Sequence, residues 1–219
     1  MSTNSRLGNL GAIFKEGESD LLNCIARLSV LYEDLRLETT ELANMRAKLD
    51  ETGEVDHKYR VVYFLRRVFT TLSEFGGILN DVPTKVEFNQ ASLPAMDSAM
   101  DSVKRSNGYF QPRMHRINEF RNEFGAHVKP AGVEFAIRHL SDVTGKVTWN
   151  SSYKICTFRL ECDFATDIIR GAISSKLQHG ADVRTKFKSA LEMVSQAFEH
   201  AEAAIAALVD AFLWDRFGR

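Results

Sequence analysis

Residues 62–79 read VYFLRRVFTTLSEFGGIL, and their apolar side chains recur in steps of three and four. This spacing places them on one face of an α-helix, with Arg66 and Arg67 largely off that face. Pro83 closes the segment, so we expect a helix from about 55 to 80 that buries one side. The residues of the apolar face are Val62, Leu65, Phe69, Leu72, Gly76 and Leu79.

The same period recurs along most of the chain. It predicts helices over 19–52 and 182–217, with another that begins at Tyr109 or Pro112 and ends near 126. Between 84 and 108 the pattern is ambiguous, and Asn107 and Gly108 indicate a break after a short helix over 95–105. The fold class that follows is mainly α, an up-and-down bundle of four to five helices. The last helix would reach roughly 50 Å, longer than such a bundle needs, so we expect part of it to serve a dimer.

One segment has the period of a β-strand. From Cys156 to Phe164, apolar and polar residues alternate strictly, which is typical of a half-buried strand. Residues 146–149 would pair with it across a turn at 150–152. The sequence therefore predicts a small β-hairpin inserted in the bundle near 146–164, within 144–165.

Length and composition favour a single domain over 1–219, with residues 1–15 as a mobile arm. The chain has 219 residues, of which 44% are hydrophobic, and this suffices for one buried core. No apolar run approaches the ~20 residues that span a bilayer, and the first ten residues lack the apolar core of a secretory signal. The three cysteines include no Cys-x-x-Cys pair. We expect a cytoplasmic protein without a membrane segment, a disulfide framework or a zinc site.

The charge is balanced overall and basic locally. The formal net charge of −1 argues against a protein that coats nucleic acid nonspecifically. Residues 104–138, however, include seven Lys or Arg and three Glu, which gives this stretch a local charge of +4. Two interpretations remain open: a basic patch with a partner, or an ordinary solvated helix face.

Residues 121–127, Arg-Asn-Glu-Phe-Gly-Ala-His, lie within this basic stretch. Arg121 falls in an apolar row at helical spacing, which predicts that it points inward. A guanidinium is costly to bury alone, so the position calls for a carboxylate, a second subunit or a bound phosphate. The row consists of Met114, Ile117, Arg121, Phe124 and Val128.

These residue types suit transfer at a phosphodiester. The imidazole of His127 can exchange a proton near neutral pH, and Arg121 can hold phosphate oxygens and stabilise negative charge. Asn122 could orient the phosphate or the histidine. On a straight helix Arg121 and His127 point about 120° apart, so they converge only if the helix ends at Gly125 or a second subunit supplies the pair again.

Other residues near the motif have supporting roles in this hypothesis. Glu119 and Glu123 would fix the arginine, and Arg113, Arg116 and Lys129 would contact substrate. No Glu lies three residues before His115 or His127, and no Gly-rich phosphate loop is found, so we expect neither a metal nor another cofactor.

The Arg121-Asn122-x4-His127 string, in a mainly helical chain with the segment Tyr63–Phe75, resembles the HEPN superfamily. The resemblance covers residues 20–140 and 182–217. It implies a four- or five-helix bundle that dimerises to form a composite site. It also implies metal-independent cleavage of RNA, in toxin–antitoxin, abortive-infection or CRISPR-linked defence. The partners to expect are a second copy of the chain, RNA, and an antitoxin or other protein.

The alternative is a noncatalytic helical interaction protein. In that reading Arg121 forms a structural ion pair, for instance with Glu74, and the long C-terminal helix and the hairpin form a partner surface. The two hypotheses differ in what replacement of Arg121 removes: activity in the first, stability in the second.

Overall fold

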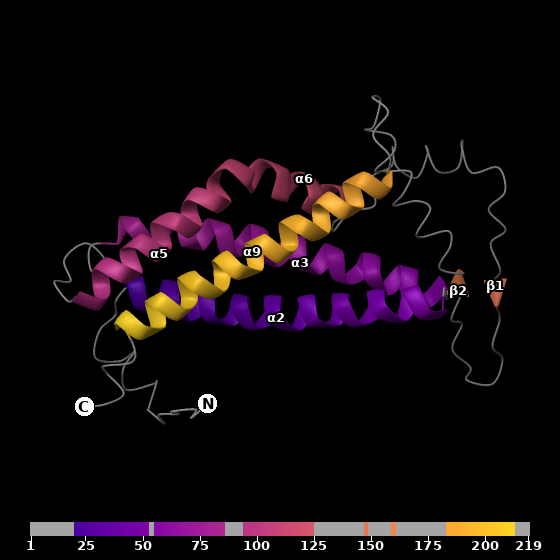
Figure 1. Ribbon diagram of the computed structural model, residues 1–219, viewed down its shortest axis with the longest axis horizontal. Helices are drawn as coiled ribbons and strands as arrows, with labels where there is room; N and C mark the ends of the chain where they lie inside the picture. The colour runs from indigo at the N-terminus through magenta and orange to yellow at the C-terminus, as the bar shows by residue number, and fades with distance from the viewer. Residues whose placement is uncertain are drawn as a thin grey trace, which may run out of the picture. The chain divides into compact units, whose positions relative to one another are not determined.

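The computed structural model describes residues 20–52, 55–85, 94–124, 147–148, 159–160 and 183–212. These residues are almost entirely helical (Figure 1). None of the helices within them combines the length and the apolar character needed to cross a membrane. The α-helices are α2 (Asp20–Thr52), α3 (Val55–Asp81), α5 (Pro94–Phe110), α6 (Met114–Phe124) and α9 (Val183–Phe212), and the 3-10 turns are η1 (Val82–Thr84) and η2 (Gln111–Arg113).

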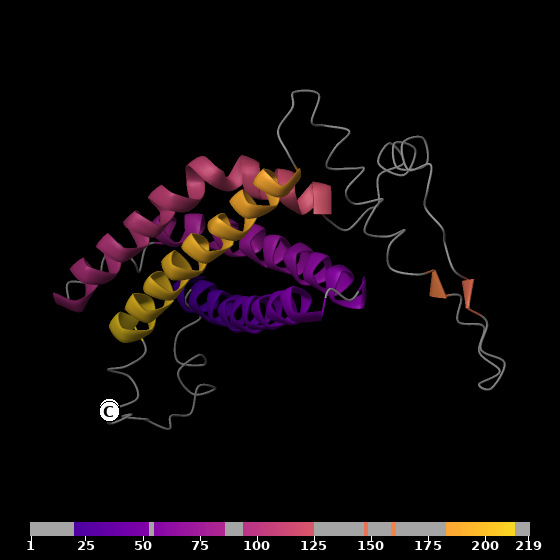
Figure 2. The same cartoon turned by 45° about the vertical axis from the view of Figure 1, so that its right-hand side comes forward.

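The described residues form four helical segments, because α5 passes through η2 directly into α6 (Figure 2). The mainly α class is therefore confirmed. Two short strands, β1 (Val147–Thr148) and β2 (Arg159–Leu160), pair antiparallel, with Val147 opposite Leu160. Residues 149–158, which include the predicted turn at 150–152, lie outside the described residues. The rest of the predicted hairpin lies outside the described residues, and the hairpin stays a prediction.

The chain divides into two compact units, and each contains a piece of all four helical segments. Unit 1 comprises residues 1–36, 71–115 and 195–219, and unit 2 comprises residues 37–70 and 116–194. Helical packing is thus the architecture of both units. A single domain over 1–219 stays a prediction.

The periodicity of residues 62–79 gave α3 correctly. All six residues of its predicted apolar face are buried, whereas Arg67 is exposed. The prediction for the first helix also agrees with α2, whose buried residues include Leu28 and Leu35. Local period was sufficient here because the buried residues of each helix recur at helical spacing.

The predicted break at Asn107 and Gly108 was wrong, because α5 continues to Phe110. The side-chain amide of Asn107 donates a hydrogen bond to the carbonyl of Leu79 on α3, 3.2 Å away. Packing against another helix therefore outweighs the low helix propensity of this pair. The interruption comes later, in η2, where Pro112 has no N–H to continue the α-helical hydrogen bonds.

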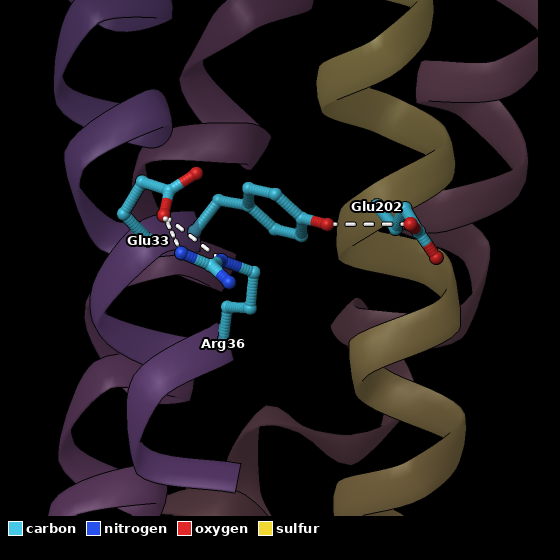
Figure 3. A network of polar contacts seen from close by, with 4 residues as sticks. Glu33, Arg36 and Glu202 are labelled. Atoms are coloured by element: carbon cyan, nitrogen blue, oxygen red, sulfur yellow. Dashed lines mark hydrogen bonds and ion pairs between the residues drawn. The ribbon is translucent and has the colours of Figure 1, made fainter. Parts of the chain in front are cut away.

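Polar and aromatic contacts join α2 to α9 in unit 1. The ring of Tyr32 stacks on Phe198 with centroids 5.7 Å apart, and its hydroxyl donates to Glu202 at 3.3 Å. Figure 3 shows this bond beside an exposed ion pair on α2, in which Arg36 lies 2.9 Å from Glu33.

In unit 2, α2 and α3 are joined by an ion pair of a different kind. The Arg67 Nε atom lies 3.1 Å from a carboxylate oxygen of Glu38, whose side chain is only 8% exposed. A carboxylate removed from water needs compensation of this kind, whereas a fully solvated one does not.

Gly76 marks a close approach between α3 and the junction of α5 with α6 in unit 1. A Cβ atom there would lie 2.6 Å from the sulfur of Met114 and 3.1 Å from the ring of Phe110, whereas one at Gly77 would meet nothing within 4 Å.

Gly77→Ala should raise the free energy of unfolding by about 0.5–1 kcal/mol, because alanine is the better helix former. Gly76→Ala should be less stable than Gly77→Ala by about 1–3 kcal/mol, because of overpacking. Urea denaturation of both variants measures this difference, and equal stabilities would contradict the close approach.

The two ion pairs of α2 give a second matched comparison. Arg67→Met keeps the aliphatic stem but takes the guanidinium from the buried Glu38, so the free energy of unfolding should fall by about 1–3 kcal/mol. Arg36→Met breaks a solvated pair and should change it by less than about 0.5 kcal/mol. Thermal unfolding at matched pH compares them, and a larger loss in Arg36→Met would refute this ranking.

Candidate functional site

Arg121 lies in the last turn of α6, at the border of the buried face. The buried positions of this helix include Ile117 and Phe120, and the Phe120 ring packs on Phe69 of α3 with centroids 4.8 Å apart. Arg121 itself is half-buried. The sequence predicted an inward arginine. The structure places it beside the apolar row, with Phe120 as the inward aromatic residue.

The structure describes only some of the other predicted site residues. Asn122 and Glu119 are exposed on α6. The side chain of Glu123, and all of His127 and Lys129, lie outside the described residues. Arg121 and Asn122 are therefore adjacent on the final described turn of α6, and their convergence with His127 stays a prediction.

The predicted substrate contacts Arg113 and Arg116 have partners within the fold. Arg113 donates from Nη1 to the backbone carbonyl of Tyr109 at 3.1 Å, and its Cζ atom lies 4.2 Å from the centroid of the Tyr109 ring. Arg116 donates from Nη2 to the hydroxyl of Ser189 on α9 at 2.8 Å, and its Cζ atom lies 5.7 Å from the Phe120 ring. A phosphate would have to compete with these contacts for both guanidinium groups.

A second cluster, of Arg113, Tyr109 and His200, was not identified from the sequence. The imidazole of His200 on α9 stacks on Tyr109 of α5, with centroids 4.4 Å apart and ring planes 22° apart. The hydroxyl of Ser106 donates to the backbone carbonyl of His200 at 2.9 Å. The only local signal was the four-residue spacing of Tyr109 and Arg113, because the third member comes from a distant part of the chain.

The environment of this cluster favours the uncharged forms of both rings. Burial lowers the pKa of His200; Glu199 opposes this effect, and the positive charges of Arg113 and Arg105 add to it. Burial also raises the pKa of Tyr109, with Arg113 opposing and Glu199 adding to that shift. A neutral imidazole and a neutral phenol are thus the ground state of the stack.

Cys24, the cysteine on α2, is buried, and burial raises the pKa of its thiol. A protonated thiol is a poor nucleophile, so this residue acts as part of the core. Within the described residues, no group of His, Cys, Asp or Glu side chains is arranged to hold a metal ion.

No protein-family model, curated protein or solved structure matches this chain.

The contacts of Arg113 and Asn122 lead to different expectations for their replacement. Arg113→Ala removes a cation–π contact and a hydrogen bond to a helix-end carbonyl, so the free energy of unfolding should fall by about 1–2 kcal/mol. Asn122→Ala alters an exposed side chain and should change it by less than about 0.5 kcal/mol. Urea denaturation of the two variants provides the test. An Asn122→Ala variant as destabilised as Arg113→Ala would assign Asn122 to the fold and remove it from the candidate site.

Proposed function

We propose that this chain is a HEPN-like, metal-independent endoribonuclease whose site combines Arg121, Asn122 and His127 at a homodimer interface. The observation that carries the proposal is the position of Arg121 and Asn122. They are consecutive residues in the last turn of α6, beside a buried row that fixes the helix, and Asn122 is exposed to solvent. A helix that packs through a buried row and has an exposed polar side chain beside it is a suitable base for a catalytic site.

RNA supplies the nucleophile for the reaction. His127 would accept the proton of the 2′-hydroxyl while the 2′-oxygen forms a bond to phosphorus. The bond from phosphorus to the 5′-oxygen then breaks, and a second imidazole, His127 of the other subunit, would give that oxygen a proton. The products are a 2′,3′-cyclic phosphate and a free 5′-hydroxyl.

Arg121 would stabilise the charge that grows on the phosphate oxygens in the transition state. Asn122 would orient the phosphate or the imidazole, and Glu119 and Glu123 would hold the guanidinium in place. The partial exposure of Arg121 is consistent with this role, because a deeply buried guanidinium could not reach a phosphate. A cytoplasmic role in toxin–antitoxin or phage-defence systems, with an antitoxin or other protein partner, belongs to the same proposal.

The test is cleavage of total RNA in EDTA by the purified full chain, with detection of 2′,3′-cyclic phosphate ends. Arg121→Ala should reduce cleavage about 10²–10³-fold, and His127→Ala about 10²–10⁴-fold, because each removes a group that acts in the transition state. Arg60→Ala, which replaces an exposed arginine on α3 outside the motif, is the matched control and should cleave like the parent. Thermal unfolding of every variant shows whether a lost activity reflects a lost fold.

Cleavage that survives in both motif variants would contradict the proposal.

A second candidate, a noncatalytic helical interaction protein, is favoured by one observation: Arg113 and Arg116, which lie in the same basic stretch, both contact other residues of the fold. If Arg121 resembles them, Arg121→Ala should lower stability by about 1–3 kcal/mol. Destabilisation of this size, together with no fragments from the parent, would select this candidate.

A further inference from the structure

We propose that the stack of His200 on Tyr109 is a pH-sensitive latch between α9 and α5, closed while the imidazole is neutral and opened when it gains a proton. The inference concerns unit 1 alone and does not depend on RNA cleavage. It rests on the geometry of the two rings, on the charges around them, and on the hydrogen bond that Ser106 makes at the same place.

The geometry gives the neutral rings a close contact. The centroids of His200 and Tyr109 are 4.4 Å apart and the ring planes are 22° apart, which is a stacked arrangement. Tyr109 is 7% exposed, and Ser106 is 1% exposed where it binds the carbonyl of His200. α5 and α9 are thus joined at His200 through both its side chain and its backbone.

Protonation of His200 would place a second positive charge against the Tyr109 ring, which the Arg113 guanidinium already contacts. An imidazolium against a phenol is normally attractive, but the guanidinium of Arg113 already lies 4.2 Å from the centroid of the Tyr109 ring. The charged groups that act on His200 are Arg105 and Arg113 from the α5 and η2 side and Glu199 from α9 itself. Two positive charges therefore disfavour protonation of His200, and one negative charge favours it.

The pKa of His200 lies below its ordinary value of about 6.5, mainly because of burial. The folded chain consequently binds this proton less readily than the unfolded chain does. By linkage, the contribution of the latch is fully present above the unfolded pKa and is lost progressively as pH falls below it. The bond from Ser106 to the His200 carbonyl contains no group that titrates in this range, so the opening is confined to the rings.

The first experiment compares the parent with His200→Phe, which keeps an aromatic ring and cannot be protonated there. Urea denaturation of the full chain is followed between about pH 7.5 and about pH 5. We expect the urea concentration at the midpoint of unfolding to fall further in the parent than in His200→Phe when the pH is lowered. Equal losses in the two proteins would overturn the latch.

A second experiment uses two exposed positions, so it does not depend on a core replacement that folds. NMR titration of the His200 imidazole in the full chain should give a midpoint below about 6.5. Arg105→Gln removes a positive charge and should move that midpoint upward, whereas Glu199→Gln removes a negative charge and should move it further down. The ring signals of Tyr109 should change with the same midpoint in each protein.

Three outcomes of the titration would reject the proposal. One is a midpoint at or above that of an unstructured histidine. Another is a shift of the same sign in Arg105→Gln and Glu199→Gln. The third is a Tyr109 signal that does not follow the titration of His200, because the rings would then not separate on protonation.

Discussion

The hydrogen bond from Ser106 to the backbone carbonyl of His200 sets the principal constraint on unit 1. The serine side chain is short, so its hydroxyl can lie 2.9 Å from a backbone carbonyl of another helix only when the two helix backbones are close together. Large side chains at the crossing would prevent such an approach, and α9 has the buried small residues Ala197, Ala201 and Ala204 around His200. These buried alanines let α9 come near enough for Tyr109 and His200 to stack.

The basic stretch from 104 to 138 shows how charge pattern and charge function can differ. A local charge of +4 suggested a surface for phosphate, but two of its arginines hold the fold: Arg113 binds the carbonyl and ring of Tyr109, and Arg116 binds Ser189. Arginine suits these tasks because its planar group can donate hydrogen bonds and lie over an aromatic ring simultaneously. A count of charges therefore overstates what this stretch offers a substrate, and Arg121 has to be judged from its own position.

Residues 62–79 were enough to predict α3, because a helix with one continuous apolar face is specified by local spacing. The continuity of α5 through Asn107 was not predictable in this way, since its amide is bound by the carbonyl of Leu79 on another helix. The same reason explains why the stack of His200 was missed: Tyr109 and His200 are far apart in sequence and meet only after folding. Arg121 is an intermediate case, because its spacing from Ile117 indicated the correct side of α6 but could not separate the centre of the apolar row from its border.

The structure places His200 near Arg113, and the proposed function pairs His127 with Arg121; the two histidines would have opposite roles. An acid–base catalyst needs access to its substrate and a pKa near the working pH. The imidazole of His200 is covered by a tyrosine ring, its pKa is lowered by burial, and the nearby guanidinium is engaged with that same ring. These features make a good contact and a poor catalyst. Arg121 and Asn122 lie in the last turn of α6, and Asn122 is open to solvent. For this reason the proposal of catalysis belongs to the end of α6 and that of a latch to the crossing of α5 and α9.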